Sequence, residues 1–248
     1  SIGLVGSEMC IRDSICIATG GRPREISGVH NSSNIWFYKE ALQVDKIPKK
    51  LLVVGSGAIG VEFASFFAQM GSDVSLLESK PTILPNEDLE VSNFVEKQFL
   101  KRGIKVYKNH SLLSLKEKGS LFEAELKSEN KTLSLEFEKA ILAIGIVGNI
   151  ENLNLESINI NCSNGSIVVD EYCKTNVDNI YAIGDVASPP WLAHKASHEG
   201  ISVAEQIAGM NAHPIKKDRI PACTYCDPEV ASIGLTEKEA VENGFDFK

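Results

Sequence analysis

Three glycines and one glutamate have the types and the spacing needed to hold a diphosphate and a sugar. Gly55, Gly57 and Gly60 follow the apolar run 51–54, and Glu78 follows a second predicted strand at 73–77. The first glycine permits a tight turn, the second lets the backbone approach a pyrophosphate, and the third lets a helix pack close to a strand. Glu78 lies 18 residues after Gly60, near the spacing of about 20 that is typical of an acid binding an adenosine ribose.

The elements expected around these residues suit the same chemistry. A strand, a glycine turn, a helix reaching Met70 and a second strand follow one another, and the helix start offers free N–H groups and a positive dipole end to phosphates. A glycine-rich turn without a ligand is the alternative, but the combined context favours a dinucleotide site. The remaining residues of the candidate loop are Ser56, Ala58, Ile59 and Val61.

Glu78 also predicts which dinucleotide is bound. A carboxylate at this position suits a ribose 2′-hydroxyl and repels a 2′-phosphate. The segment from Ser79 to Thr82 contains no arginine that would attract a phosphate, and Lys80 is the only cation nearby. We therefore expect NAD rather than NADP.

Further strands and helices must position this loop. Residues 86–102 have helical spacing, with Gly103 at the expected C-terminal cap, and 193–209 has a similar period. Among the apolar positions of the first of these helices we name Leu89, Phe94, Val95 and Leu100. Buried strands are expected at 15–20 and 139–144, alternating strands at 121–127 and 133–137, and further strands at 179–183 and 230–234.

Composition limits the class of protein. The 248 residues suffice for two domains, the hydrophobic fraction is 43%, and the net charge of −8 without a long basic run argues against nucleic acid and anionic membranes. The apolar runs are too short for a transmembrane helix. The six cysteines lack the rhythm of a disulfide framework, which favours reduced thiols and a cytoplasmic location, or the mitochondrial matrix in a eukaryote.

The two ends of the sequence differ from the rest of the chain. Residues 1–14 lack the basic start and apolar core of a signal peptide and resemble the translation of a sequencing adaptor, so they are expected to be non-native. Near the other end, Thr236 and Glu239 have the spacing of a capping box. The chain stops seven residues after Val241, too early to complete that unit, so truncation is expected there.

Four ordered blocks together resemble the flavin-dependent pyridine-nucleotide–disulfide oxidoreductases, from about residue 15 to 248. They are 18–20, the glycine loop 55–62, 143–145 and 180–185. The resemblance implies an α/β fold with FAD and NAD as cofactors, in which a Rossmann-like NAD domain is inserted in a partial FAD-binding domain. The implied parts are FAD segments at 15–34 and 149–213, an NAD domain at 35–148, and the start of an α+β dimer-interface domain at 214–248.

Within that family, 192–200 and 220–234 are similar to the bacterial dihydrolipoamide dehydrogenases. This implies oxidation of dihydrolipoyl groups on the lipoyl domain of an acyltransferase component in 2-oxoacid dehydrogenase complexes. Electrons would pass through a cysteine pair and FAD to NAD, in a homodimeric parent enzyme. Another disulfide reductase or a transhydrogenase of the family is one alternative. A non-catalytic NAD-binding module is the other.

The sequence departs from the family pattern in several places. It lacks the N-terminal FAD glycine motif, the Cys-x-x-x-x-Cys pair and the C-terminal His and Glu base, so no catalytic residue is assigned and the chain alone is expected to be inactive. The segment 146–149 replaces the usual Arg-x-Pro-Asn. Cys223 and Cys226 would point to opposite faces of a strand, so neither a disulfide nor a metal site is expected there.

On the flavin side, the resemblance implies that Asp185 binds the FAD ribitol, although a strand-end aspartate can also cap a turn. Thr19, Gly20 and Gly21 would approach the flavin nucleotide, unless they form a plain strand-exit turn. The residues implied to line the flavin, with the histidine in contact rather than in proton transfer, are Trp191, Leu192, Ala193 and His194. Packing at a helix start is the alternative for His194.

On the NAD side, the resemblance adds three residues to the glycine loop. Glu62 would lie near an NAD ribose, and its alternative is a first-turn acid favoured by the helix dipole. Leu112 and Gly145 would touch the NAD, and each is equally compatible with a place in the core or in a turn.

Overall fold

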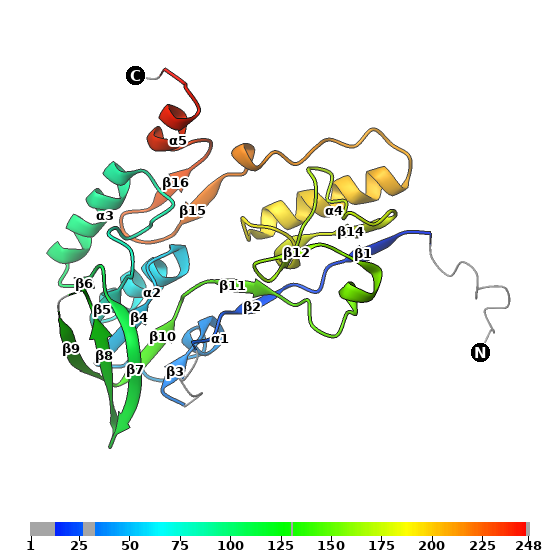
Figure 1. Ribbon diagram of the computed structural model, residues 1–248. Coiled ribbons are helices and arrows are strands. Elements are labelled where there is room, and N and C mark those ends of the chain that lie inside the picture. Colours follow the sequence, from blue (N-terminus) through cyan, green and yellow to red (C-terminus); the bar gives the residue numbers. More distant parts are fainter. Residues whose placement is uncertain (1–12, 27–32, 130, 247–248) are drawn as a thin grey trace. The chain divides into compact units, whose positions relative to one another are not determined.

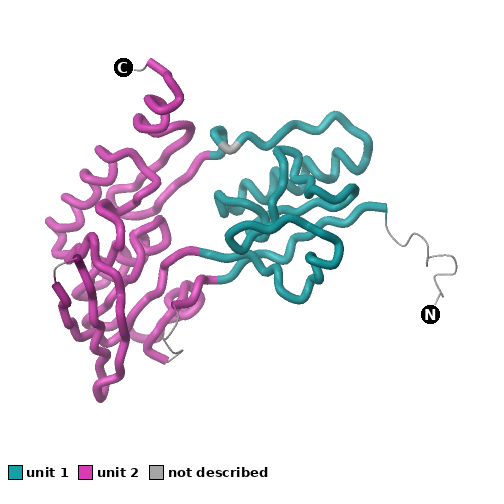
Figure 2. The backbone as a smooth tube through the Cα atoms, viewed as in Figure 1, with its two compact units in different colours: residues 1–22, 146–220 teal, residues 23–145, 221–248 magenta. Residues whose placement is uncertain are grey.

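The computed structural model describes residues 13–26, 33–129 and 131–246 (Figure 1). Two compact units form the chain: residues 1–22 with 146–220 make unit 1, and 23–145 with 221–248 make unit 2 (Figure 2). The C-terminal segment therefore groups with the glycine loop. The expected non-native segment 1–14 lies almost wholly outside the described residues, which begin at Asp13. No helix in the described ranges has the length and apolar character needed to cross a bilayer.

Unit 2 is built on a five-stranded sheet in which every neighbouring pair is parallel. Helix α2 (Ala58–Gln69) connects β4 to β5, and α1 (Tyr38–Ala41) follows β3. The strand beside β4 on its other edge is β10, which comes much later in the chain, so the strand order reverses next to β4. In spatial order the strands are β3 (Ile35–Trp36), β10 (Lys139–Leu142), β4 (Lys50–Val54), β5 (Asp73–Leu77) and β6 (Lys105–Tyr107).

Strand β4 is apolar throughout its centre because both of its faces are covered. Leu51 and Val53 belong to a core formed with the helices, whereas Leu52 and Val54 belong to a second core. The second core is closed by an antiparallel sheet of β7 (Ser111–Lys118), β8 (Leu121–Lys127) and β9 (Thr132–Phe137). The two strands expected in this region from alternation are present as β8 and β9.

Helix α3 (Leu89–Lys101) forms where the helical spacing predicted it, and Gly103 follows its end with a φ of +84°. Its buried face is Ser92, Val95 and Phe99. Of the four apolar positions named from the sequence, only Val95 lies in the core, because the other three fall on the opposite face. Those three are Leu89, Phe94 and Leu100, with exposed fractions of 63%, 54% and 54%.

The C-terminal segment forms an antiparallel pair, β15 (Ala222–Thr224) and β16 (Val230–Ser232), followed by helix α5 (Glu237–Glu242). The predicted capping box is confirmed: Thr236 Oγ1 accepts a 3.2 Å hydrogen bond from the backbone N–H of Glu239, whose side chain reaches back to Thr236. Cys226 and Val230 of this segment are buried in the helical core of unit 2.

Unit 1 contains the parallel pair β1 (Ile15–Ile17) and β14 (Ile180–Ala182), and helix α4 (Ala193–Ile207). Strand β1 is not buried as expected; Ile15 is 51% exposed, because β14 is its only strand partner among the described residues. The remaining elements are β2 (Gly21–Pro23) paired with β11 (Ile146–Gly148), β12 (Cys162–Ser163) paired with β13 (Ser166–Ile167), and the 3-10 helices η1 (Leu155–Ile158), η2 (Gly184–Val186) and η3 (Lys217–Arg219).

Candidate nucleotide-binding site

The glycine loop lies between the end of β4 and the start of α2, and two of its glycines are required by close packing. Gly55 has a φ of +98°, and a Cβ added there would lie 2.4 Å from the carbonyl oxygen of Ala143. A Cβ added to Gly60 would lie 1.9 Å from the carbonyl oxygen of Gly55. Any larger residue at either position would force β4, α2 and the end of β10 apart.

Gly57 has a different environment. It is the N-cap of α2, and a Cβ added there would meet no atom within 4 Å. The space in front of the helix start is therefore open, while the backbone N–H groups and the positive dipole end remain. This is the arrangement that a pyrophosphate requires, so the loop fits a dinucleotide.

Glu78 directly follows β5 and is only 7% exposed. Its Oε2 atom accepts hydrogen bonds from the backbone N–H of Ser56 at 3.1 Å and from Ser56 Oγ at 2.6 Å. Its Oε1 atom accepts from the backbone N–H of Lys80 at 2.8 Å and from Ser79 Oγ at 3.2 Å. The acid predicted for the ribose is thus bound to the glycine loop itself, a link that the sequence did not suggest.

The other residues expected on this side lie in three places. Gly145 has a φ of +108° and comes two residues after Ala143, against which the loop packs. Leu112, in β7, is half-buried against the second core. Glu62 lies beyond the first turn of α2, which contains no acid, so its reading as a first-turn acid is wrong.

Glu62 instead contacts the C-terminal segment. Its Oε1 atom accepts a 2.8 Å hydrogen bond from the backbone N–H of Tyr225. One helical turn further on, Ser65 Oγ accepts a 3.0 Å hydrogen bond from the backbone N–H of Asp227, whose carboxylate forms a 2.6 Å ion pair with Arg102. The sequence carries no local signal for these contacts, because Glu62 and Tyr225 are 163 positions apart.

In unit 1, β1 and β14 run in parallel, so the residues after them lie at the same edge. Thr19 Oγ1 donates a 2.7 Å hydrogen bond to the carbonyl oxygen of Asn149, and Asn149 Nδ2 donates one of 2.9 Å to that of Thr19. A Cβ added to Gly21 would lie 3.1 Å from that of Asp185. The structure therefore brings 19–21 and Asp185 together, and the turn at 146–149 is held without the family's usual residues.

The start of α4 carries the four residues expected to line a flavin. Trp191 and Leu192 are half-buried, and Ala193 and His194 are exposed. Below them, Lys195 and Glu199 form a buried ion pair of 2.6 Å, and Glu199 Oε2 accepts a 2.8 Å hydrogen bond from the backbone N–H of Gly184. Sequence reasoning missed this pair, although its i,i+4 spacing is a signal. It ties the turn carrying Asp185 to α4.

The cysteines of the described residues are all free. Burial raises the pKa of the Cys173 thiol to about 12 and that of the Cys226 thiol to about 11. The Cys226 thiol donates a 3.0 Å hydrogen bond to the carbonyl oxygen of Pro228, whereas Cys223 is exposed. Within the described residues, no group of three or more His, Cys, Asp or Glu side chains is arranged to hold a metal ion.

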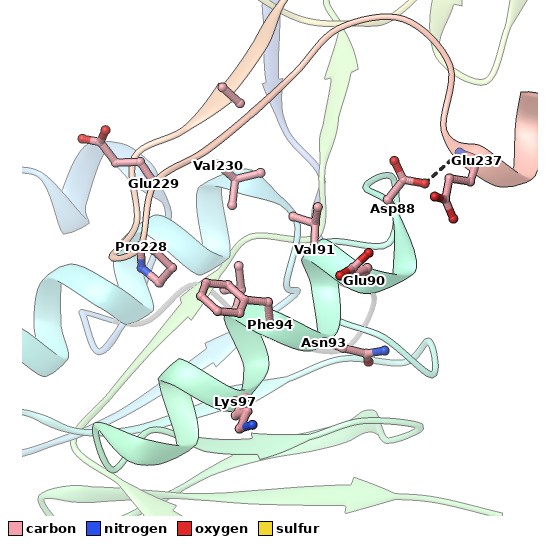
Figure 3. A pocket seen from close by; sticks show the side chains of 12 residues that line it. Asp88, Glu90, Val91, Asn93, Phe94, Lys97, Pro228, Glu229, Val230 and Glu237 are labelled. Atoms are coloured by element: carbon pink, nitrogen blue, oxygen red, sulfur yellow. Dashed lines mark hydrogen bonds between the residues drawn. The ribbon is translucent and has the colours of Figure 1, made fainter. Parts of the chain in front are cut away.

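A surface cavity of 630 Å³ lies between α3 and the loop before β16 (Figure 3). Val91 and Phe94 point into it from the helix, and Val230 faces them (Figure 3). At one end the backbone N–H of Glu237 donates a 2.8 Å hydrogen bond to Asp88. None of the residues that line this cavity belongs to the predicted nucleotide sites.

A parallel sheet whose strand order reverses beside a glycine-rich loop is the architecture of a dinucleotide-binding α/β protein. The family model for pyridine nucleotide-disulphide oxidoreductases matches residues 6–200, and the model for the dimerisation domain of the same enzymes matches 220–248. The chain belongs to this family, whose members use FAD and NAD.

The chain is similar to several proteins named dihydrolipoyl dehydrogenase. It is 48% identical to one from Rhizobium etli, over 94% of this chain and 49% of that protein. It is also 48% identical to one from Zymomonas mobilis, over 94% of this chain and 51% of that protein. Among solved structures it resembles LpdA from Mycobacterium tuberculosis, with a TM-score of 0.86 and 27% identity over 93% of this chain and 50% of that one. It spans about half the length of these relatives.

Proposed function

We propose that this chain is part of a dihydrolipoyl dehydrogenase, in which unit 2 binds NAD and unit 1 contributes to FAD binding. The observation that carries the proposal is the open N-terminus of α2 at Gly57, with Glu78 held beside the same loop. The 48% identity to two dihydrolipoyl dehydrogenases supports this substrate class. The parent enzyme would oxidise dihydrolipoyl groups and reduce NAD.

On the NAD side, the N–H groups at the start of α2 hold the pyrophosphate, and Glu78 accepts a hydrogen bond from the adenosine ribose. Gly145 lies at the end of the strand neighbouring β4, so it borders the same edge of the sheet. Glu62 uses Oε1 for Tyr225 and contributes its other carboxylate oxygen to a ribose, and Leu112 completes the site.

On the FAD side, Asp185 binds the ribitol, and the turn formed by Thr19, Gly20 and Gly21 approaches the flavin nucleotide. The residues at the start of α4 line the flavin ring, namely Trp191, Leu192, Ala193 and His194. Bound FAD supplies the electron transfer between a dithiol and NAD. The part of the protein described in unit 1 orients the flavin and excludes water from it.

We base the proposed oligomeric state and electron donor on the same family. The segment 220–248 matches a dimerisation domain, which supports a homodimer of the parent enzyme, and its electron donor is the lipoyl domain of an acyltransferase component. The free cysteines favour a reducing compartment, so we place the protein in the cytoplasm. The functional domains are FAD segments at 15–34 and 149–213, an NAD domain at 35–148 and a dimerisation segment from 214.

Calorimetry with NADH tests the NAD site in the 248-residue chain. We expect weak binding, little or no bound FAD, and no turnover with lipoamide. Gly57→Ala should abolish NADH binding, because its methyl group enters the space of the pyrophosphate. Gly200→Ala, where an added Cβ would be in ordinary 3.7 Å contact, is the matched control and should bind normally. Normal binding by Gly57→Ala would refute the assigned pyrophosphate position.

A second measurement tests the ribose role of Glu78. Glu78→Ala should weaken NADH binding by about 1.5–3 kcal/mol, the range for a hydrogen bond to a charged group. An unchanged affinity by calorimetry would exclude this role, whatever the effect of the substitution on stability.

A structural likeness favours a second candidate activity. The HOCl-induced flavoprotein disulfide reductase RclA from Escherichia coli has a TM-score of 0.82 and 25% identity over 94% of this chain and 54% of that one. Another disulfide reductase of the family is therefore the alternative, although its identity is lower than that of the dihydrolipoyl dehydrogenases. Assays of the full-length protein with dihydrolipoamide and with other dithiols would separate the two.

A further inference from the structure

We infer that Ser56 is a positioning residue, which orients the Glu78 carboxylate toward the dinucleotide and thereby sets the discrimination between NADH and NADPH. The inference rests on the NAD site proposed above. It concerns a residue between the first two glycines of the loop, where the glycine pattern itself places no requirement on the side chain.

The geometry of the pair supports this role. Ser56 is completely buried and Glu78 nearly so. Two hydrogen bonds from Ser56, one from its backbone N–H and one from its hydroxyl, converge on the single oxygen Oε2. A carboxylate has about four acceptor sites, two on each oxygen. Ser56 therefore fills both acceptor sites of Oε2, so a ligand hydroxyl can bond the carboxylate only at Oε1.

The other carboxylate oxygen has an exchangeable partner. Oε1 accepts from the backbone N–H of Lys80 at 2.8 Å and from Ser79 Oγ at 3.2 Å, the longest of the four contacts. Ser79 is exposed, so its hydroxyl can turn to water when a ribose hydroxyl replaces it. The ligand then gains a charge-assisted hydrogen bond without moving the carboxylate.

Ser56 is itself held in place. Its carbonyl oxygen accepts a 2.9 Å hydrogen bond from the backbone N–H of Leu84. One residue thus joins the glycine loop, the end of β5 and the segment that follows it. Every residue type except proline would supply the backbone N–H to Glu78, but the 2.6 Å bond requires a small side chain with a hydroxyl group. Without it, the carboxylate can rotate away from its position.

Rotation of the Glu78 carboxylate would change the affinities for NADH and NADPH in opposite directions. A fixed anion beside the ribose binds a 2′-hydroxyl and repels a 2′-phosphate. If the anion moves, NADH loses its hydrogen bond and NADPH is repelled less. Replacing Ser56 should therefore reduce the ratio of the NADH affinity to the NADPH affinity. A general loss of stability would not change this ratio.

Calorimetry with NADH and with NADPH on the 248-residue chain tests the inference. Ser56→Ala should weaken NADH binding about tenfold, equivalent to about 1.4 kcal/mol, and leave NADPH binding unchanged or stronger. Ser56→Cys, which keeps the side-chain size but is a weak donor, should behave in the same way and covers the case in which the alanine variant does not fold. Ser72→Ala is the matched control, because Ser72 is also buried and donates a 2.6 Å hydrogen bond to Pro48. It should leave the ratio unchanged.

The outcomes separate the inference from the proposed function. If both Ser56 variants weaken NADH and NADPH equally, or neither changes the ratio, the positioning role is overturned while the NAD site stands. If the unsubstituted chain binds no NADH, the proposed function itself fails.

Discussion

The Glu62 carboxylate on α2 accepts a 2.8 Å hydrogen bond from the backbone N–H of Tyr225, in the segment matched by the dimerisation-domain model. The helix that begins at the glycine loop is thereby joined to the start of the dimerisation segment. Two further polar contacts, Asp227 to Ser65 and Asp227 to Arg102, reinforce this junction. A change in the position of either part would have to break these contacts.

Replacing Glu62 should weaken this junction. Glu62→Ala removes the acceptor for the Tyr225 N–H and should lower the free energy of unfolding by about 0.5–1.5 kcal/mol, because the contact is exposed to solvent. Glu62→Gln keeps an acceptor oxygen and should cost less. Denaturant unfolding of the unsubstituted chain, Glu62→Ala and Glu62→Gln measures these differences in stability. Equal stability of Glu62→Ala and the unsubstituted chain would mean that the contact contributes nothing.

Substitutions at two glycines of the loop should differ in their effect on stability. Gly60→Ala places a methyl group on the Gly55 carbonyl oxygen and should destabilise the chain by about 3 kcal/mol, at the upper end of overpacking costs. Gly57→Ala should cost less, about 1 kcal/mol for alanine at a helix N-cap, because its methyl group meets no protein atom within 4 Å. Thermal unfolding without ligand compares the two. A larger loss in Gly57→Ala than in Gly60→Ala would contradict the assigned packing.

The buried ion pair of Lys195 and Glu199 should show strong coupling. Either Lys195→Met or Glu199→Leu alone leaves an uncompensated charge in the interior and should cost about 3–5 kcal/mol. The double variant should cost less than the sum of the two. A double-mutant cycle by denaturant unfolding gives the coupling energy, and additive losses would show that the pair does not act as a unit. The backbone N–H of Gly184 loses its acceptor in Glu199→Leu and in the double variant.

Stability should fall in alkali because of Cys173. Burial raises the pKa of its thiol from 9.0 to about 12, so the unfolded chain loses this proton first as the pH rises. The contribution is fully present below pH 9.0 and is lost between 9.0 and about 12, with a slope of up to about 1.4 kcal/mol per pH unit. Unfolding of the chain and of Cys173→Ala across this range measures the effect. Parallel profiles for the two proteins would exclude it.

Local sequence signals predicted the parts of the site that depend on neighbouring residues. The order of strand, turn, helix and strand follows from hydrophobic period and from glycines at 55, 57 and 60. The Thr236–Glu239 capping box is local as well, and it is present as predicted. These features are readable because the steric demands of a tight turn or a helix cap act within a few residues.

Features that depend on distant partners were not predictable in this way. Three of the four apolar positions named on α3 are exposed, because the face that packs is chosen by the sheet beneath and not by composition. Strand β1 looks like a buried strand from its residues, yet burial depends on how many strands flank it.

The residues alone predict a diphosphate-binding loop followed by an acid at ribose spacing, and they identify the family that this pattern resembles. Three contacts become visible only in the folded chain: Ser56 holds the acid, Glu62 is hydrogen-bonded to Tyr225, and Glu199 holds Gly184. A motif constrains residues that are close along the chain. Hydrogen bonds between residues 15 to 163 positions apart arise only when the packed core brings their elements together.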